Sequence, residues 1–470
     1  MWNLVVYILI LAILNSILFF DNYLGLNVIL FAIPLLVFLF YVLKINKKIN
    51  NKYGLLFMIP ILILSCAYFV YDNIFNIFNL LVIPILYILM LIYTVKPTYN
   101  LIEIIKDGIY FVFKPFDFIG KFYNVIKVNL NKKIKLSKEI KDKIRSILIV
   151  IPIVIVVLSL LSTADMIFGN MFKGMFKFID HLSIEDSIFR IIMIVVFFTY
   201  FGAFINYLLF GYEKEERNNS NIKVSSYTIK LLLCSLNIIY VIFDFIQIRS
   251  LLLHQVSSNI NYAEYAREGF FQLMIISVIN LVILLISKHS KENKFVKVMS
   301  VIMVLLTSII ICSSFIRMSM YEAQYGYTVL RLLVYVILIT EMILLIPTVV
   351  YILKNKFNVL KYYLIIITII YTLINLVSID YVIAYRNINR YYDKNKIDML
   401  YLENGRTDNI PLLIDLYNNT KENKLKEEIG MYLVSYFTSD YHNNIFEYNI
   451  SNSRAHKLII DNEYVKKYKN

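Results

Sequence analysis

The amino-acid sequence has little charge and few of the residues on which metal and disulfide chemistry depend. Only 17% of its 470 residues are charged, whereas an ordinary soluble protein has about 25%. The three cysteines, Cys66, Cys234 and Cys312, lie inside apolar runs, and the five histidines are scattered without a ligand motif. A soluble enzyme, a disulfide-bonded secreted protein and a zinc site are therefore excluded, and we expect no metal and no cofactor.

The positive charge of the chain does not indicate nucleic acid. The net charge is +14, but the lysines lie in clusters between apolar runs and not along a groove with interleaved aromatic rings. This pattern is typical of a membrane protein, because basic residues set the orientation of its helices in the bilayer. We therefore expect a lipid bilayer as a partner and no nucleic acid.

Apolar residues are abundant, at 59% of the chain. This excess is too large for one hydrophobic core, since a single core stops growing at about 250–300 residues. It is arranged in runs such as VILFAIPLLVFLFYVL, whose lengths approach the roughly 20 residues of a membrane-spanning helix. The predicted fold class is all-α, a polytopic helical membrane bundle of about eleven spans. The predicted spans are residues 4–20, 28–44, 55–71, 79–95, 147–163, 190–211, 229–250, 271–287, 298–316, 332–353 and 362–380.

The distribution of lysine and arginine predicts how this bundle is oriented. With the N-terminus inside, the connections at 45–54, 96–146, 212–228, 288–297 and 354–361, with their adjoining helix ends, carry 27 basic residues. The opposite connections carry six. Cytoplasmic connections are the ones enriched in lysine and arginine, so the predicted topology is N-in and C-out.

Composition divides the chain into four predicted parts. These are a four-span membrane segment (1–95), a cytoplasmic amphipathic segment (96–146), a seven-span membrane core (147–380) and a polar helical extracytoplasmic segment (381–470). In the last part, IPLLIDLYNNT and KLKEEIGMYLVSYF show apolar residues at helical spacing. Pro411 suits the first turn of a helix.

Residues 96–146 interleave apolar and aromatic residues with lysines. One interpretation is a pair of helices in the headgroup region, with Lys114, Lys121 and Lys127 at anionic lipid. Pro115 is expected to divide them. The alternative is a helical hairpin that packs under the bundle.

Several ionisable or polar side chains fall within or beside the predicted spans. Glu341 lies at the centre of the tenth span, and Asp165 lies at the outer end of the fifth. In the seventh span, Asn237, Asp244 and Gln247 share one helix face by their spacing. A charge at the bilayer centre is unfavourable by at least about 2.5 kcal/mol, so these groups are protonated, paired or beside a wet cavity. The alternative is a hydrogen-bond network that only fixes helix packing.

The arginines follow the opposite distribution to the lysines. Nine of the eleven lie on the predicted outer side, while 25 of the 36 lysines lie inside. Guanidinium groups bind carboxylate or phosphate in a bidentate geometry that an ammonium does not match, so the sequence predicts an outward-facing site for an anionic ligand. The alternative is a set of local salt bridges. The candidate ligand-binding residues are Glu264, Arg267, Arg317, Tyr321, Glu322, Tyr325, Arg331, Asn387 and Arg390.

Three separated motifs carry a family resemblance. YAEYAREGFFQLMIISVINLVIL, RMSMYEAQYGYTVLR and DYVIAYRNINRY, followed by IDMLYL and DNIPLL, resemble a bacterial family of multi-spanning membrane proteins, domain of unknown function 4153/4173. The similarity runs from about Ser162 to about Leu413. Tyr327 stands where the family has a small or apolar residue. The resemblance implies an all-helical protein of the bacterial cytoplasmic membrane and implies no reaction. The matching positions are Ala164, Asp165, Tyr262, Glu264, Tyr265, Arg267, Gly269, Phe270, Arg317, Tyr321, Tyr325, Gly326, Thr328, Arg331, Ala384, Asn387, Arg390, Asp398, Tyr401, Leu402, Asp408 and Pro411.

Three functional hypotheses follow. The first is a non-enzymatic envelope protein, transporter-like or accessory, that binds an anionic small molecule or lipid headgroup on the outside. The second is an envelope enzyme acting on a lipid-linked or phosphorylated substrate with an outer acid as general base, although no nucleophile–base pair is evident. The third is a membrane sensor or regulatory subunit that contacts a membrane-protein partner through residues 96–146.

Overall fold

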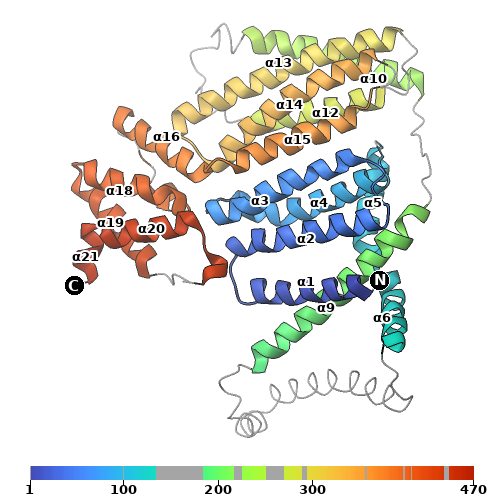
Figure 1. The fold of residues 1–470 in the computed structure, drawn as a ribbon. Helices are drawn as coiled ribbons and strands as arrows, with labels where there is room; N and C mark the ends of the chain where they lie inside the picture. The colour runs from blue at the N-terminus through green and yellow to red at the C-terminus, as the bar shows by residue number, and fades with distance from the viewer. Residues whose placement is uncertain are drawn as a thin grey trace, which may run out of the picture.

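The structure is a computed structural model whose described elements are all helices (Figure 1). Among its described residues, nine helices are long and apolar enough to cross a membrane, and a bent pair forms a further candidate. These observations confirm the polytopic helical bundle. The described residues are 2–98, 100–133, 184–215, 225–249, 269–287, 294–354, 357–394, 397, 399–403, 405–438 and 444–469.

The first group of helices, here called the first bundle, has its own apolar core. Its members are α1 (Trp2–Phe19), α2 (Leu26–Ile45), α3 (Met58–Val70) with the 3₁₀ turn η1 (Lys52–Phe57) before it, α4 (Phe75–Val95) and α9 (Ile184–Phe210). Successive helices pack side by side, and α9 crosses α1 obliquely (Figure 1). The core is built from fully buried side chains such as Leu43, Ile61, Leu64 and Tyr207.

The second bundle contains α10 (Ser226–Gln247), α12 (Phe270–Ser287), α13 (Lys294–Tyr325), α14 (Val329–Leu353) and α15 (Val359–Asn375). The two bundles meet where α15 packs on α3. Beside this contact, the amide of Asn79 on α4 donates to Asn375 Oδ1 at 2.8 Å, and the Tyr371 hydroxyl donates to Asn79 Oδ1 at 2.8 Å. These hydrogen bonds link the first turns of α4 to the last turns of α15 and so join the two bundles.

Ten of the eleven predicted spans fall on these helices, and the span at 147–163 lies outside the described residues. One expectation needs correction. The predicted spans 298–316 and 332–353 leave the motif RMSMYEAQYGYTVLR as a connecting loop, but α13 continues to Tyr325 and leaves only a short turn before α14. Met, Glu, Ala and Gln favour helix wherever they lie, so the helix does not stop where its apolar run stops. Within the predicted part 147–380, α9 packs on α1 of the first bundle. The predicted domain boundaries themselves stay a prediction.

The segment after α4 forms α5 (Leu101–Phe113), the 3₁₀ turn η2 (Lys114–Phe118) and α6 (Ile119–Lys133). Pro115 lies in the first turn of η2, which confirms the predicted break. Both helices pack on neighbouring parts of the first bundle. The choice between the headgroup and the hairpin interpretation stays a prediction. Lys114 pairs with Asp117 and Glu215 at 3.8 and 3.9 Å, and contact of these lysines with lipid stays a prediction.

The C-terminal residues form a separate helical cluster beside the ends of both bundles (Figure 1). Pro411 lies in the first turn of α18, as predicted. Buried Leu413, Ile429, Leu433 and Ile459 form its core. Its elements are α16 (Ile379–Lys394), α17 (Met399–Glu403), η7 (Thr407–Asn409), α18 (Ile410–Asn419), α19 (Asn423–Thr438), η8 (Ile445–Glu447), α20 (Ile450–Asp461) and α21 (Glu463–Lys469).

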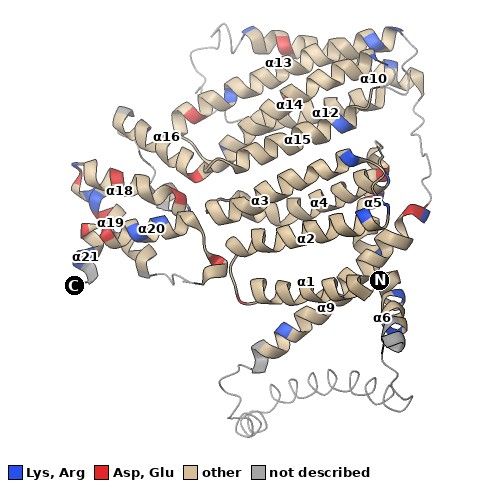
Figure 2. Ribbon diagram, viewed as in Figure 1, with Lys and Arg blue, Asp and Glu red and all other residues tan. Residues whose placement is uncertain are grey.

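The basic connections gather at the end of the bundles away from this cluster (Figure 2). Lys48 pairs with Glu213 at 2.5 Å, and the Lys96 ammonium donates to the carbonyl oxygen of Glu215 at 2.6 Å. Three connections far apart in sequence therefore share one end, as the predicted topology requires. That this end is the cytoplasmic one stays a prediction.

Candidate functional site

Buried polar side chains concentrate in the second bundle. They are contributed by four helices, and several carry charge or hydrogen-bonding capacity that lipid does not satisfy. Asp244 and Glu341 are only 2% and 3% exposed. The set comprises Asn237, Tyr240, Asp244 and Gln247 on α10, Ser277 and Asn280 on α12, Thr307 and Arg317 on α13, and Glu341 on α14.

Asn280 connects three of these helices at the centre of the bundle. The Tyr240 hydroxyl donates to Asn280 Oδ1 at 2.8 Å, and Asn280 Nδ2 donates to Thr307 Oγ1 at 3.0 Å. Thr307 in turn donates to the carbonyl oxygen of Met303 at 2.7 Å. The amide thus acts as acceptor and donor at once, a role that no apolar side chain replaces.

Glu341 lies within hydrogen-bond distance of Ser277, which is one helical turn before Asn280 on α12. The Ser277 Oγ lies 2.5 Å from Glu341 Oε2 and 2.7 Å from the carbonyl oxygen of Met274. A serine hydroxyl has a single proton to donate. If Ser277 donates it to the carbonyl, the short contact with Glu341 needs a proton on the carboxyl group. This geometry favours a neutral Glu341.

Asp244 and Arg317 lie toward the end of the bundle nearest the C-terminal cluster. Among the described residues, neither carboxyl oxygen of Asp244 has a hydrogen-bond partner. Arg317 Nη2 donates to Gln247 Oε1 at 3.0 Å. Gly269, whose φ is +99°, lies against this guanidinium, and a β-carbon there would come within 3.4 Å of Nη1. A second buried acid and a buried guanidinium therefore extend the network along the bundle.

A second cluster surrounds residues 324–328, which are the last two residues of α13 and the turn that leads into α14; this segment is here called the arginine turn. Arg331 donates to the carbonyl oxygen of Gly326, and Arg390 donates to that of Gln324. The Arg386 guanidinium lies 5.8 Å from the centre of the Tyr327 ring. Three guanidinium groups, from α14 and α16, therefore converge on one turn.

Asn387 fixes the arginine turn to α16. Its Oδ1 accepts the Tyr327 backbone N–H at 2.8 Å, and its Nδ2 donates to the Tyr327 carbonyl oxygen at 2.9 Å. Gly326, with φ at +82°, leaves no room for a side chain, because a β-carbon would lie 2.7 Å from Asn387 Oδ1. The turn and α16 therefore form one joint.

The partners of these arginines are neutral. In the part of the chain that the structure describes, no carboxylate lies within ion-pair distance of Arg331, Arg386 or Arg390. Arg331 also covers the Tyr321 ring, with its Cζ 4.3 Å from the ring centre. Carbonyl oxygens and aromatic faces orient a guanidinium without cancelling its charge, so the turn keeps a local positive charge.

The other predicted ligand residues are divided between the two clusters. Tyr325 packs on Tyr321, with ring centres 5.0 Å apart, and Glu322 accepts a hydrogen bond from the Tyr335 hydroxyl at 2.9 Å. Arg317 belongs to the buried network. Asp165, Glu264 and Arg267 lie outside the described residues. The structure therefore brings together Tyr321, Tyr325, Arg331, Asn387 and Arg390.

A third polar group joins the C-terminal cluster to the first bundle. Asp72, between α3 and α4, accepts from Arg406 at 2.9 Å and from the Thr407 hydroxyl at 3.1 Å. Asp408 accepts from Ser378 and, at 3.4 Å, from the backbone N–H of Asp72. Burial raises the pKa of the Asp408 carboxyl. This group is here called the acidic latch. Of its residues only Asp408 was among the family-matching positions, and no contact between 381–470 and the first bundle was predicted from the sequence.

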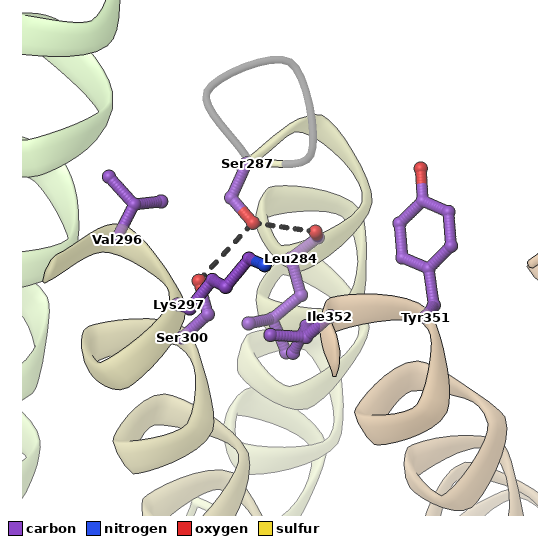
Figure 3. Close-up of a pocket in the computed structure, with 7 residues that line it drawn as sticks. All are labelled: Leu284, Ser287, Val296, Lys297, Ser300, Tyr351 and Ile352. Carbon is purple, nitrogen blue, oxygen red and sulfur yellow. Dashed lines mark hydrogen bonds between the residues drawn. The ribbon is translucent and has the colours of Figure 1, made fainter. Parts of the chain in front are cut away.

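A small cavity lies at the basic end of the second bundle (Figure 3). Its volume is about 10 Å³, close to the least that holds one water molecule. Ser287 faces it and bonds the Leu284 carbonyl oxygen at 2.8 Å and the Ser300 hydroxyl at 3.3 Å. It is too small for a solute.

Comparison with known proteins extends the sequence resemblance. The model of the family described as domain of unknown function 4153 matches residues 58–416, which are 359 of the 470 residues. The match begins with α3 and ends in α18, so it reaches about a hundred residues further toward the N-terminus than the motifs predicted. No curated protein and no solved structure matches the chain. The arginine turn and the latch residue Asp408 lie inside the match, and the chain belongs to the domain of unknown function 4153 family.

Proposed function

We propose that this integral membrane protein binds an anionic ligand at the arginine turn and acts as a transporter-like or accessory component of the cell envelope. The observation that carries the proposal is the convergence of Arg331, Arg386 and Arg390 on one turn with neutral partners only, among the described residues. Fixed guanidinium groups whose charge is not cancelled attract carboxylates and phosphates. In the predicted topology this face lies outside the cytoplasm of a bacterial cell.

The rigid joint supports ligand capture over a purely packing role. Asn387 and Gly326 hold the turn in one conformation, so an anion meets arginines that are already oriented and loses little affinity to ordering them. Arg386 contacts only the Tyr327 ring in the described structure. Such a contact leaves all its N–H donors available to a ligand.

The buried network supports movement of the ligand as well as capture. Asp244 and Glu341 lie on α10 and α14 of the second bundle, and the arginine turn joins α14 to α13 in the same bundle. Intramembrane carboxyl groups that face a bundle interior are typical of proton-coupled pathways. Movement coupled to protonation of these groups is the transporter form of the proposal, and binding alone is its accessory form.

The experiment compares anion binding by the purified protein and by two single variants. Differential scanning fluorimetry in detergent measures the melting temperature with millimolar inorganic phosphate or succinate, against chloride at equal ionic strength. Arg386→Gln removes a guanidinium that makes no hydrogen bond in the described structure, so folding stays intact. We expect about tenfold weaker apparent affinity, which is ~1.4 kcal/mol.

Arg454→Gln is the matched control. Arg454 is exposed on α20, in the same cluster of helices but outside the arginine turn. This variant is expected to bind like the unmodified protein. Equal affinities for all three proteins, or no stabilisation of any of them by either anion, contradict the proposal.

A further inference from the structure

The first bundle contains an apolar groove that the proposed function does not use. Its volume is about 480 Å³, within the roughly 300–1,000 Å³ of small-molecule sites. Side chains of α1 to α5 and of α9 enclose it. The helix α9 crosses α1 obliquely (Figure 1). Its aromatic residues Phe197, Tyr200, Phe201 and Phe204 line the groove.

The chemistry of the walls restricts what the groove holds. Of the eighteen residues that line it, only Ser65, Tyr87 and Tyr200 have polar side-chain atoms. Each of these hydroxyls already donates to a backbone carbonyl oxygen, that of Ile61 at 2.7 Å, Ala32 at 3.3 Å and Val112 at 3.0 Å. A polar solute loses its hydration there and gains no new partner. The groove therefore suits a hydrocarbon chain.

The surroundings of the groove are those of the lipid layer. Phe111 and Val112 of α5 close one end. This helix buries its polar Glu103 and Asp107 against the protein and exposes Ile105 and Ile109, which are 54% and 51% exposed. A helix whose apolar side faces outward belongs in the bilayer and not in water. The molecules available to fill the groove are therefore lipids.

Arg190 supplies a charged group at the other end. It is on α9 seven, eleven and fourteen residues before Phe197, Phe201 and Phe204, so it shares their helix face. Its guanidinium lies 4.6 Å from the centre of the Phe20 ring, next to the lining residue Phe19. Among the side chains that the structure describes, no carboxylate lies within ion-pair distance of it.

We propose that the groove is a specific lipid site, which takes an acyl chain of an anionic phospholipid and places its phosphate at Arg190. The chain lies along the aromatic face of α9 and ends at α5. Among the described side chains, the guanidinium that meets the headgroup has a neutral ring beside it and no carboxylate within ion-pair distance, which favours an anionic lipid over a zwitterionic one. The site is independent of the arginine turn, which lies on other helices.

Tryptophan quenching by brominated lipid tests the proposal on the full chain. The protein has one tryptophan, Trp2, so Trp2→Phe gives a silent background. Phe197→Trp then reports from the groove, and Val196→Trp reports from the next residue of the same helix, which is 61% exposed to lipid. Both variants are reconstituted in phosphatidylcholine vesicles with a small and rising fraction of dibrominated phosphatidylglycerol.

The groove reporter is expected to reach half-maximal quenching at about fivefold lower brominated lipid than the neighbouring reporter. Arg190→Gln in the Phe197→Trp protein is expected to remove that difference. Dibrominated phosphatidylcholine is expected to quench both reporters alike. Coincident curves with phosphatidylglycerol overturn the lipid site, and a preference unchanged by Arg190→Gln overturns the headgroup assignment.

Discussion

The two bundles are built from similar apolar sequences but hold together differently. In the first bundle the deeply buried residues are mostly leucine, isoleucine and aromatic side chains, and its groove is lined by apolar side chains. In the second bundle Asn280, Ser277 and Thr307 are fully buried and bonded between helices. Lipid solvates an apolar helix as well as protein does, so association in a membrane depends on close packing and on polar contacts.

This difference indicates which bundle has a role beyond packing. Buried carboxyl groups are unfavourable in lipid and persist where they have a use. Among the described helices long enough to span a membrane, the buried carboxyl groups are those of Asp244 and Glu341, both in the second bundle. Two other buried acids, Glu103 and Asp107, lie on the shorter α5 and accept hydrogen bonds from Thr98 and Tyr212. The first bundle is instead suited to lipid contact. Four substitutions test this contrast, in order of decreasing expected effect.

The largest effect is expected for a packing change in the first bundle. Leu64 of α3 is fully buried, and Leu64→Ala leaves a cavity that the surrounding helices fill only in part. We expect a loss of about 3 kcal/mol in the free energy of unfolding, measured by denaturant titration in micelles. Ile59→Ala, on the same helix at an exposed position, is the control and is expected to change little. Equal effects at both positions contradict the packing interpretation.

A smaller effect is expected for the central hydrogen bonds of the second bundle. Asn280→Ala removes the partner of both Tyr240 and Thr307. Interhelical hydrogen bonds in membranes contribute about 0.6 kcal/mol each on average and up to about 1.7, so a loss of roughly 2 kcal/mol is expected. The control in the first bundle is Asn206→Ala, which breaks only a bond to Gly202 within its own helix. Similar losses in the free energy of unfolding for Asn280→Ala and Asn206→Ala contradict the claim that the second bundle depends more on hydrogen bonds between helices.

The acidic latch gives a pH effect smaller than either. Burial raises the pKa of Asp408, so the folded protein holds this proton more tightly than the unfolded chain. Its stabilising contribution is therefore present at low pH and is lost as pH rises through the folded pKa. The unfolding midpoint of the protein is expected to fall as pH rises through the raised pKa of Asp408, and Asp408→Asn is expected to reduce that fall. An identical pH profile in the variant rules out Asp408 as a source.

The sequence was sufficient for the helices because their signal is local. Apolar runs of span length and the helix break at Pro115 can be read from the local sequence, without knowing which helices pack together. The predicted end of the span at residue 316 was not the end of the helix. An apolar run marks the membrane boundary, while Met320, Glu322 and Ala323 continue α13 beyond it. The packing of α9 on α1 depends on residues that are far apart in sequence, and no local pattern encodes it.

The candidate site was predictable in its members and not in its arrangement. Polar residues inside spans pointed to Asp244 and Glu341, and the same criterion applied to SVINLV points to Ser277 and Asn280, which we did not single out. The arginines were singled out because they lie on the predicted outer side, where basic residues are uncommon. Their convergence on one turn depends on the joint that Asn387 makes with Tyr327, which joins residues sixty positions apart. No sequence pattern pointed to Asp72, because a single acid in a predicted outer loop is commonplace.

The smallest change in stability is expected for Glu341→Gln, and it is also the sharpest test of the buried network. Ser277 has one proton and two acceptors at hydrogen-bond distance. When that proton goes to the Met274 carbonyl oxygen, a neutral Glu341 donates to the serine oxygen. A glutamine amide donates in the same place, and the free energy of unfolding is expected to change by less than about 0.5 kcal/mol. Glu341→Ala, which leaves the serine without that partner and opens a void, is expected to lose about 1–2 kcal/mol. A buried carboxylate that was charged would instead make Glu341→Gln strongly stabilising, because the substitution removes an unpaired charge from lipid. Unfolding titrations of the three proteins in the same micelle separate these outcomes, and a shift above about 1 kcal/mol for the glutamine variant excludes a neutral Glu341.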